Sequence, residues 1–175
     1  MENKKVLFVG PVGAGKTSAI QAASDIECVN TEAKISAGKA APEKSMTTVA
    51  IDYGQMTLDN GDKVHLYGAP GQQRFDFMWD MLSNEMAAGA ELVVVMIDNA
   101  GDNPLESLKY YTNAFADMIA KSALLVAVTR SDVSASTTPE MYQECLAAQS
   151  LNGSVAFIDA RERQTVRELL SSFVA

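Results

Sequence analysis

The residues between Gly10 and Thr17 have the types and the spacing needed to bind the phosphates of a nucleotide. They read Gly-Pro-Val-Gly-Ala-Gly-Lys-Thr, which fits the pattern G-x-x-x-x-G-K-[ST]. Glycines let the backbone curve so that successive N–H groups point at one phosphate, and a helix N-terminus adds partial positive charge. Lys16 would add a full charge for the β- and γ-phosphates, and the Thr17 hydroxyl would be a ligand for Mg²⁺. The alternative interpretation is an ordinary glycine-rich turn between a strand and a helix.

The segments on either side of this loop fit the phosphate-binding interpretation. Residues 5–9 form a short apolar run that predicts a strand, and residues 17–23 are good helix formers. A strand, a glycine-rich loop and the start of a helix are the context in which a triphosphate binds, and this context makes a chance match to the pattern rarer. The expected phosphate-binding residues in this loop are Gly13, Ala14, Gly15, Lys16, Thr17 and Ser18.

Along the rest of the chain, predicted strands alternate with predicted helices. Further strands are expected at 47–58, 63–67, 91–98, 124–129 and 154–158, and helices at 75–86, 104–120, 139–148 and 162–173. Asn60-Gly61 predicts a hairpin, so one strand should run antiparallel. Residues 26–46 lack regular periodicity, so we expect a long loop there, with a short helical turn at 31–36. The sequence thus predicts an α/β fold with a six-stranded, mostly parallel sheet, helices on both faces, and a single domain over residues 1–175.

Composition narrows the range of functions. The chain has 175 residues, a formal net charge of −8 at pH 7 and a pI near 4.6, which argues against nucleic acid or an anionic membrane as a partner. No apolar run approaches the roughly 20 residues that span a bilayer. The N-terminus leaves no room for a signal peptide and neither end carries a lipidation motif, so we expect no direct membrane anchor. Cys28 and Cys145 are far apart in sequence, which favours reduced thiols and a cytoplasmic location.

Five segments together make the chain resemble the Ras-like small GTPases, which are P-loop NTPases, along its whole length. Within them it is most similar to the prokaryotic branch that includes MglA-type GTPases. The segments, in the family's order, are residues 10–17, 46–53, 67–75, 129–132 and 159–161. The resemblance implies a guanine-nucleotide-binding molecular switch that binds Mg-GTP and hydrolyses it to GDP. Switch I would span about residues 27–48 and switch II about residues 68–80, and both would signal the nucleotide state to partners.

Residues of the two switch segments match family residues that meet the γ-phosphate or the attacking water. Thr48 matches the threonine that binds Mg²⁺ through its side chain and the γ-phosphate through its N–H, with Thr47 one register away. Gly71 matches the glycine whose N–H senses the γ-phosphate, and Gln72 matches the glutamine that orients the attacking water. The resemblance therefore implies the catalytic residues Gln72, Lys16 and Gly71, and the metal ligands Thr17 and Thr48.

Two segments near the C-terminal half resemble the loops that read guanine. Residues 129–132 resemble the family's [NT]-K-x-D segment, with Arg130 in place of the usual Lys. The Asp132 carboxylate can accept hydrogen bonds from guanine N1–H and N2–H₂, a pair of donors that adenine lacks; its alternative role is a helix N-cap. Residues 159–161 resemble the S-A-K loop, in which the Ala160 N–H would face guanine O6. The expected base-binding residues are Thr129, Arg130, Asp132, Ala160 and Arg161.

The chain departs from the family pattern at positions that affect metal binding and turnover. Gly68 stands where the family has a switch II Asp that holds Mg²⁺ through water, so Asp52 or water would have to replace that Asp. Residues 27–53 contain no Arg and cannot supply an arginine finger, and Val12 adds a branched side chain to the phosphate loop. The resemblance therefore implies slow hydrolysis without a partner, and protein regulators or effectors such as a roadblock-type regulator. A nucleotide-bound adaptor with little or no GTPase activity is the alternative function.

Overall fold

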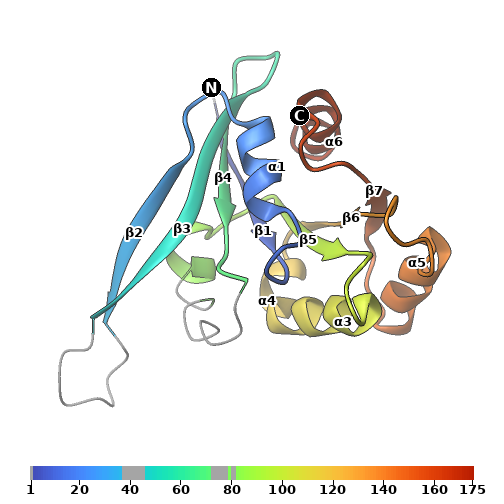
Figure 1. Ribbon diagram of the computed structural model, residues 1–175. Coiled ribbons are helices and arrows are strands. Elements are labelled where there is room, and N and C mark those ends of the chain that lie inside the picture. The colour runs from blue at the N-terminus through green and yellow to red at the C-terminus, as the bar shows by residue number, and fades with distance from the viewer. Residues whose placement is uncertain (1, 37–45, 72–78, 80–81) are drawn as a thin grey trace.

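One mixed β-sheet forms the centre of the molecule (Figure 1). The structure is a computed structural model that describes residues 2–36, 46–71, 79 and 82–175. The strands are β1 (Asn3–Val9), β2 (Val29–Ser36), β3 (Met46–Thr57), β4 (Lys63–Gly68), β5 (Leu92–Asp98), β6 (Ala123–Thr129) and β7 (Ser154–Phe157). The helices are α1 (Lys16–Ala23), α3 (Pro104–Ala114), α4 (Ala116–Ile119), α5 (Pro139–Ala148) and α6 (Arg163–Val174), with a π-helical turn η2 (Leu82–Met86).

The strands follow the spatial order β2-β3-β4-β1-β5-β6-β7. The pairs from β4 to β7 are parallel, and β2–β3 and β3–β4 are antiparallel. Because carboxyl ends of parallel strands meet at one edge of a sheet, the loops that follow β1, β4, β6 and β7 leave the same edge. These loops carry most of the residues that the sequence analysis selected.

The predicted α/β fold class is confirmed, with one strand beyond the six expected. Those six lie close to their predicted positions, whereas β2 lies in the segment 26–46, where we expected a loop and a helical turn at 31–36. Val29, Thr31 and Ile35 occupy alternate positions of this strand and are β-branched, which favours extended backbone. All of β2 pairs with β3, which gives its backbone groups hydrogen-bond partners. The predicted loop is therefore partly a hairpin arm, and its residues 37–45 lie outside the described ranges.

Two other predictions need adjustment at the level of single elements. The helix predicted over 104–120 is α3 followed by α4, which are separated at Phe115, where φ is −108° and ψ is 24°. The helix predicted over 75–86 lies mostly outside the described residues, and its last part is the turn η2, closed by a hydrogen bond from Ala87 N to Leu82 O.

The hydrophobic core lies on both faces of the sheet. Alternate residues of β1 point to opposite faces, so Val6 packs with α1 and α6 while Leu7 packs with α3, α4 and α5. Both residues are fully buried. Figure 1 shows the same separation, with α1 and α6 on one side of the sheet and α3 and α4 on the other. The sheet is thus fixed from both sides, which gives rigid strand ends to the loops that they carry.

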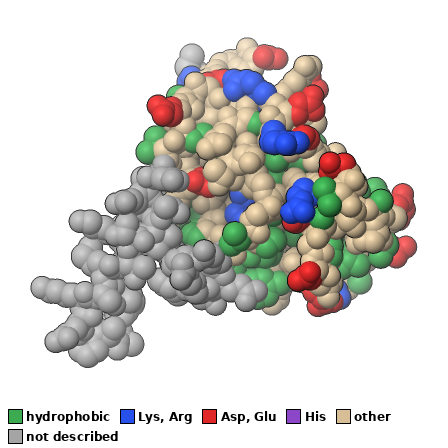
Figure 2. Space-filling view, viewed as in Figure 1, with side chains coloured by type: hydrophobic (Ala, Val, Ile, Leu, Met, Phe, Trp, Pro, Cys, Tyr) green, Lys and Arg blue, Asp and Glu red, His purple; other side chains and the backbone are tan. Residues whose placement is uncertain are grey.

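On the face drawn in Figure 2, side chains of one charge do not gather into a single large patch. In Figure 2, Lys and Arg side chains form several separate patches, and acidic side chains are scattered around the outline. None of the described helices is long and apolar enough to cross a membrane.

Candidate functional site

The loop of residues 10–15 joins the central strand β1 to the first helix. Gly15 is the N-cap of α1 and has a φ of 98°, a left-handed conformation that glycine adopts without strain. A Cβ at Gly15 would lie 3.1 Å from Cβ of Ala160, which belongs to the loop after β7. The phosphate loop therefore packs directly against one of the segments predicted to bind the base.

Lys16 is buried, and its ammonium group contacts the backbone of its own loop. Nζ donates to the carbonyl oxygens of Gly10 and Pro11, each at 2.7 Å. Burial lowers the pKa of Lys16 to about 8, and the negative charge of Asp52 opposes this shift only in part. Since burial disfavours the charged amine, an added anion beside Nζ would stabilise it. The loop is therefore suited to a phosphate group next to Lys16.

Thr17 and Asp52 bring two oxygen ligands together at the start of α1. Thr17 Oγ1 donates a hydrogen bond to the carboxylate of Asp52, which lies in β3. Both residues line a hollow of about 320 Å³, together with the phosphate loop and residues 68–71. Hydroxyl and carboxylate oxygens are ligands that Mg²⁺ prefers, so the two side chains fit this ion. The other expected ligand, Thr48, has its backbone in β3 opposite Lys34 of β2, and its side chain is not among those described.

The described ranges do not contain a complete protein cage for a metal ion. Within them, no group of three or more His, Cys, Asp or Glu side chains is placed to hold one. Mg²⁺ in nucleotide sites is commonly held by one or two protein oxygens, by phosphates and by water. The Thr17–Asp52 pair therefore has the kind and number of protein oxygens that such a site uses.

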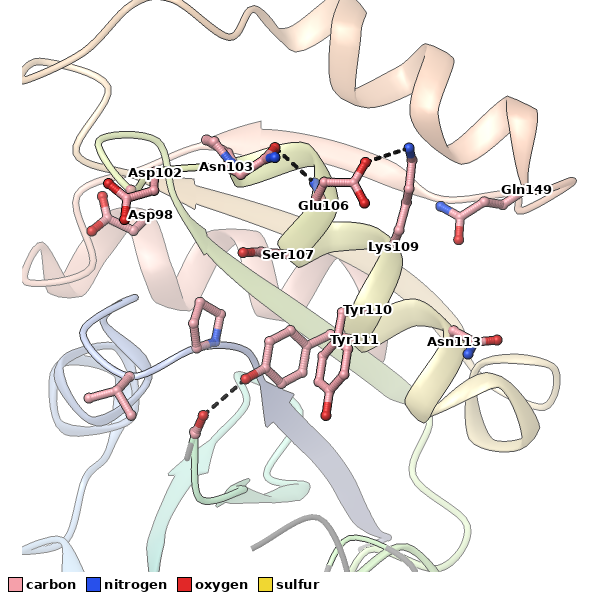
Figure 3. A pocket seen from close by; sticks show the side chains of 15 residues that line it. Asp98, Asp102, Asn103, Glu106, Ser107, Lys109, Tyr110, Tyr111, Asn113 and Gln149 are labelled. Carbon is pink, nitrogen blue, oxygen red and sulfur yellow. Dashed lines mark hydrogen bonds and ion pairs between the residues drawn. The ribbon is translucent and has the colours of Figure 1, made fainter. Parts of the chain in front are cut away.

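Two aromatic side chains hold the backbone of Gly71 against the phosphate loop. A Cβ at Gly71 would lie 2.7 Å from Val12 N and 2.9 Å from Gly10 O, so glycine is required at this close approach to the loop backbone. Trp79 Nε1 donates to Pro70 O at 3.1 Å, and Tyr111 OH donates to Gly71 O at 3.0 Å. Figure 3 shows Tyr111 reaching from α3 toward this carbonyl. Because N–H and C=O of a trans peptide point in opposite directions, the bond to Trp79 turns the Gly71 N–H away from that ring.

A wider hollow of about 920 Å³ lies along α3 (Figure 3) and shares Val12 and Gly71 with the small hollow. It is lined by Asp102 and by Glu106, whose Oε1 lies 2.8 Å from Lys109 Nζ. This hollow borders the phosphate loop, but its lining includes neither Lys16 nor the loop's glycines. We therefore place the candidate nucleotide site elsewhere. The predicted catalytic residue Gln72 lies outside the described residues.

The predicted base-binding residues lie together beyond the carboxyl ends of β6 and β7. They line one hollow of about 710 Å³. These residues are Thr129, Arg130, Asp132, Ala160 and Arg161. Gly13, Gly15 and Ser18 line this hollow as well as the smaller one beside Lys16. The two hollows therefore adjoin at the phosphate loop, which gives a continuous place for a base at one end and phosphates at the other.

Ion pairs hold both base-side arginines near the mouth of this hollow. Arg130 Nη1 lies 2.9 Å from Asp98 Oδ2, and Arg161 Nη2 lies 2.8 Å from Asp159 Oδ2. Hydrogen bonds from the side chain and the backbone of Arg161 hold the pKa of Asp159 down to about 2. Asp132 is exposed at the same mouth. Its carboxylate is therefore accessible to a ligand that enters from solvent.

Buried hydrogen bonds connect the base-side loop to the rest of the sheet. Thr129 Oγ1 donates to Ala14 O at 2.9 Å, so this side chain ties β6 to the phosphate loop. Asn99, at the end of β5, is buried; its Nδ2 donates to Ser134 O at 2.7 Å, and its Oδ1 accepts from Tyr142 OH at 2.6 Å. The sequence analysis did not select Asn99, although a polar residue directly after a buried strand is a usable sign of such a role.

The fold and the two adjoining hollows define a P-loop nucleotide-binding protein with the fold of a G domain. A family model described as "Conserved hypothetical ATP binding protein" matches residues 21–175. The chain belongs to this family. The matched region begins after the phosphate loop, so that loop is an observation independent of the family match.

The chain is also similar to two individual proteins. The chain is 34% identical over 94 residues to the uncharacterized protein MJ1339 of Methanocaldococcus jannaschii; the aligned part is 54% of this chain and 50% of that protein. The chain thus matches about half the length of this curated relative. Among solved structures it is similar to the G domain of the FeoB iron transporter of T. maritima, with a TM-score of 0.66 and 19% identity, covering 99% of this chain and 100% of that one. At this identity the similarity concerns the fold.

Replacing Thr129 by Val tests whether its hydroxyl positions the phosphate loop. Valine keeps the shape but leaves Ala14 O without this donor, so we expect the free energy of unfolding to fall by about 1–2 kcal/mol. Thr129→Ser keeps the hydroxyl and should lose less. Urea unfolding followed by circular dichroism measures both variants. A loss for Thr129→Ser but none for Thr129→Val would mean that the methyl group, and not the hydrogen bond, supplies the stability.

Proposed function

We propose that the chain is a guanine-nucleotide-binding molecular switch that binds Mg-GTP and hydrolyses it slowly to GDP. In this proposal the two switch segments, about residues 27–48 and 68–80, change conformation with the nucleotide and are read by protein partners. The resemblance to MglA-type GTPases extends the proposal to a roadblock-type regulator. The family description names ATP instead, so the choice of base is the part of the proposal that most needs a direct test.

One observation carries the proposal. Residues from three separate segments, the phosphate loop, residues 129–133 and residues 157–161, line a single hollow of about 710 Å³. This hollow adjoins the one that holds Lys16, Thr17 and Gly71. A nucleotide needs such a pair of connected hollows, one for its base and one for its phosphates. An unrelated glycine-rich turn would have no reason to adjoin a second hollow that carries Asp132 and Arg161.

Different residues would have different roles around a bound nucleotide. Lys16 would exchange its contacts with backbone carbonyls for contacts with the β- and γ-phosphates, and the N–H groups of the loop would surround the β-phosphate. The Gly71 N–H would detect the γ-phosphate, and Gln72 would orient the attacking water. Bound Mg²⁺ would neutralise part of the phosphate charge, held on the protein by Thr17 and by the switch I threonine Thr48.

Replacing Asp132 by Asn tests the choice of base. The carboxylate would accept two hydrogen bonds from guanine, and an amide cannot accept both, so GTP affinity should fall at least about 100-fold. Affinity for xanthosine triphosphate should rise, because xanthine presents an acceptor where guanine has its amino group. Fluorescent nucleotide titration with GTP, ATP and xanthosine triphosphate measures this change, with Asp117→Asn on α4 as a control. Tighter binding of ATP than of GTP by the unaltered chain would overturn the guanine assignment.

Replacing Gln72 by Ala separates a hydrolysing switch from an adaptor. We expect the unaltered chain to release phosphate from GTP at a rate on the order of 10⁻⁴ to 10⁻² s⁻¹, and the variant to be at least about tenfold slower because the attacking water is no longer oriented. The neighbouring substitution Gln73→Ala is the control and should leave the rate unchanged. Phosphate release is measured with and without cell extract. A chain that binds GTP but releases no phosphate under either condition would be the adaptor.

Replacing Tyr111 by Phe tests whether α3 positions the γ-phosphate sensor. The ring remains, but Gly71 O loses its donor, so ordering of Gly71 should become less favourable by about 0.5–1.5 kcal/mol. Because only a triphosphate would use the Gly71 N–H, affinity for GTPγS should fall about two- to tenfold while affinity for GDP stays the same. Tyr110→Phe, on the adjacent residue of α3, is the control. Equal losses for both nucleotides would assign Tyr111 a purely structural role.

A further inference from the structure

We infer that Asp52 of β3 supplies the protein carboxylate for the Mg²⁺ of the bound nucleotide. This inference rests on the proposed function, because it concerns the metal that would accompany the nucleotide. The carboxylate would then come from β3 and not from the end of the neighbouring strand β4, where the chain has Gly68. Three observations lead to it, and they concern space, hydrogen bonding and charge.

The space beside Gly68 is already taken by Asp52. The two residues are direct register partners in the antiparallel pair β3–β4. A Cβ at Gly68 would lie 3.1 Å from Asp52 Cβ and 2.9 Å from Ile20 Cδ1. It would also lie 3.6 Å from Asp52 Oδ2, so the carboxylate stands directly beside the position that a side chain at 68 would enter. Asp52 therefore delivers a carboxylate to the location that the end of β4 leaves without one.

The hydrogen bond from Thr17 to Asp52 prepares the hydroxyl for a cation. Thr17 Oγ1 gives its proton to the Asp52 carboxylate. A hydroxyl whose proton is engaged in this way directs its lone pairs elsewhere, and these are the atoms that a hard cation binds. Both side chains line the hollow beside Lys16, where the phosphates would lie. The pair thus offers one neutral and one anionic oxygen next to the expected phosphate position.

The charge of Asp52 should affect nucleotide binding differently with and without Mg²⁺, which a purely structural role would not do. Its carboxylate is close enough to Lys16 to raise the pKa of the ammonium group against the effect of burial. Without a cation, the same carboxylate should repel an incoming triphosphate; with Mg²⁺ bound, it should attract the complex. Removing the charge should therefore weaken nucleotide binding with Mg²⁺ and should not weaken it in EDTA.

The experiment measures the affinity of full-length protein for GDP and GTPγS as a function of Mg²⁺ concentration. Fluorescent nucleotide titrations compare the unaltered chain with Asp52→Asn, and Asp59→Asn in the β3–β4 connection is the matched control. We expect Asp52→Asn to need at least about tenfold more Mg²⁺ for half-maximal tightening, with unchanged or higher affinity in EDTA. The control should behave like the unaltered chain. Electron paramagnetic resonance of Mn²⁺ in the nucleotide complex should show a weaker or altered signal for Asp52→Asn alone.

A second variant keeps the inference testable if Asp52→Asn folds poorly. Combining Asp52→Gly with Gly68→Asp places the carboxylate on β4 and removes the Asp52 Cβ that a side chain at 68 would crowd, while the end of the Ile20 side chain can move aside. We expect this pair to recover part of the Mg²⁺ dependence that Asp52→Gly alone loses. Nucleotide binding with an unchanged Mg²⁺ dependence in Asp52→Asn would overturn the inference and leave the proposed function intact. Failure of the unaltered chain to bind any nucleotide would overturn both.

Discussion

The buried ammonium group of Lys16 is the constraint on which the nucleotide side of this molecule depends. A cation that is taken out of water must find oxygen partners, and here two backbone carbonyls lie within 2.7 Å of it. These carbonyls can reach Nζ only because the loop curls back on itself between β1 and α1. The same burial lowers the pKa of Lys16 to about 8, so the ammonium group loses its proton more readily than that of a lysine in water. A phosphate beside Nζ would stabilise the charged form of Lys16, and this links the shape of the loop to its expected ligand.

The rest of the sheet keeps that loop in place through single hydrogen bonds from distant strands. Thr129 connects β6 to Ala14 of the loop, and Asn99 connects β5 to the segment that follows Asp132. On the opposite side, Tyr111 of α3 holds Gly71. Each contact comes from an element buried against the core, so the site is built from loops that are fixed at a few points to the packed sheet and helices. Loops arranged in this way can respond to a ligand without disturbing the sheet.

Sequence patterns were sufficient for the parts of this structure that depend on local periodicity. Buried strands such as β5 read as continuous apolar runs, and the phosphate loop has a fixed spacing, so both could be predicted. The strand β2 was missed because residues 37–45 separate it in the sequence from its partner β3, and Gly38 and Pro42 in that stretch of sequence obscure the alternation before it. Tyr111 was missed for a related reason: a contact between a side chain and a carbonyl 40 residues away leaves no periodic pattern in the sequence. The residues predicted to bind the base were selected only because their order resembles that of a known family.

Asp52 and Gly68 illustrate why position in space matters more than position in the sequence. A Cβ at 68 would lie 3.1 Å from Asp52 Cβ, so a carboxylate at the end of β4 and one at this point of β3 would crowd each other. A glycine at 68 avoids this crowding and leaves the space to Asp52. The motif at the end of β4 lacks its carboxylate, because Gly68 stands in the place of an Asp. The register of the sheet places the carboxylate of Asp52 on the neighbouring strand, where it accepts a hydrogen bond from Thr17. Loss of a motif residue is therefore weak grounds for inferring loss of metal binding when an adjacent strand can present the same atoms to the same hollow.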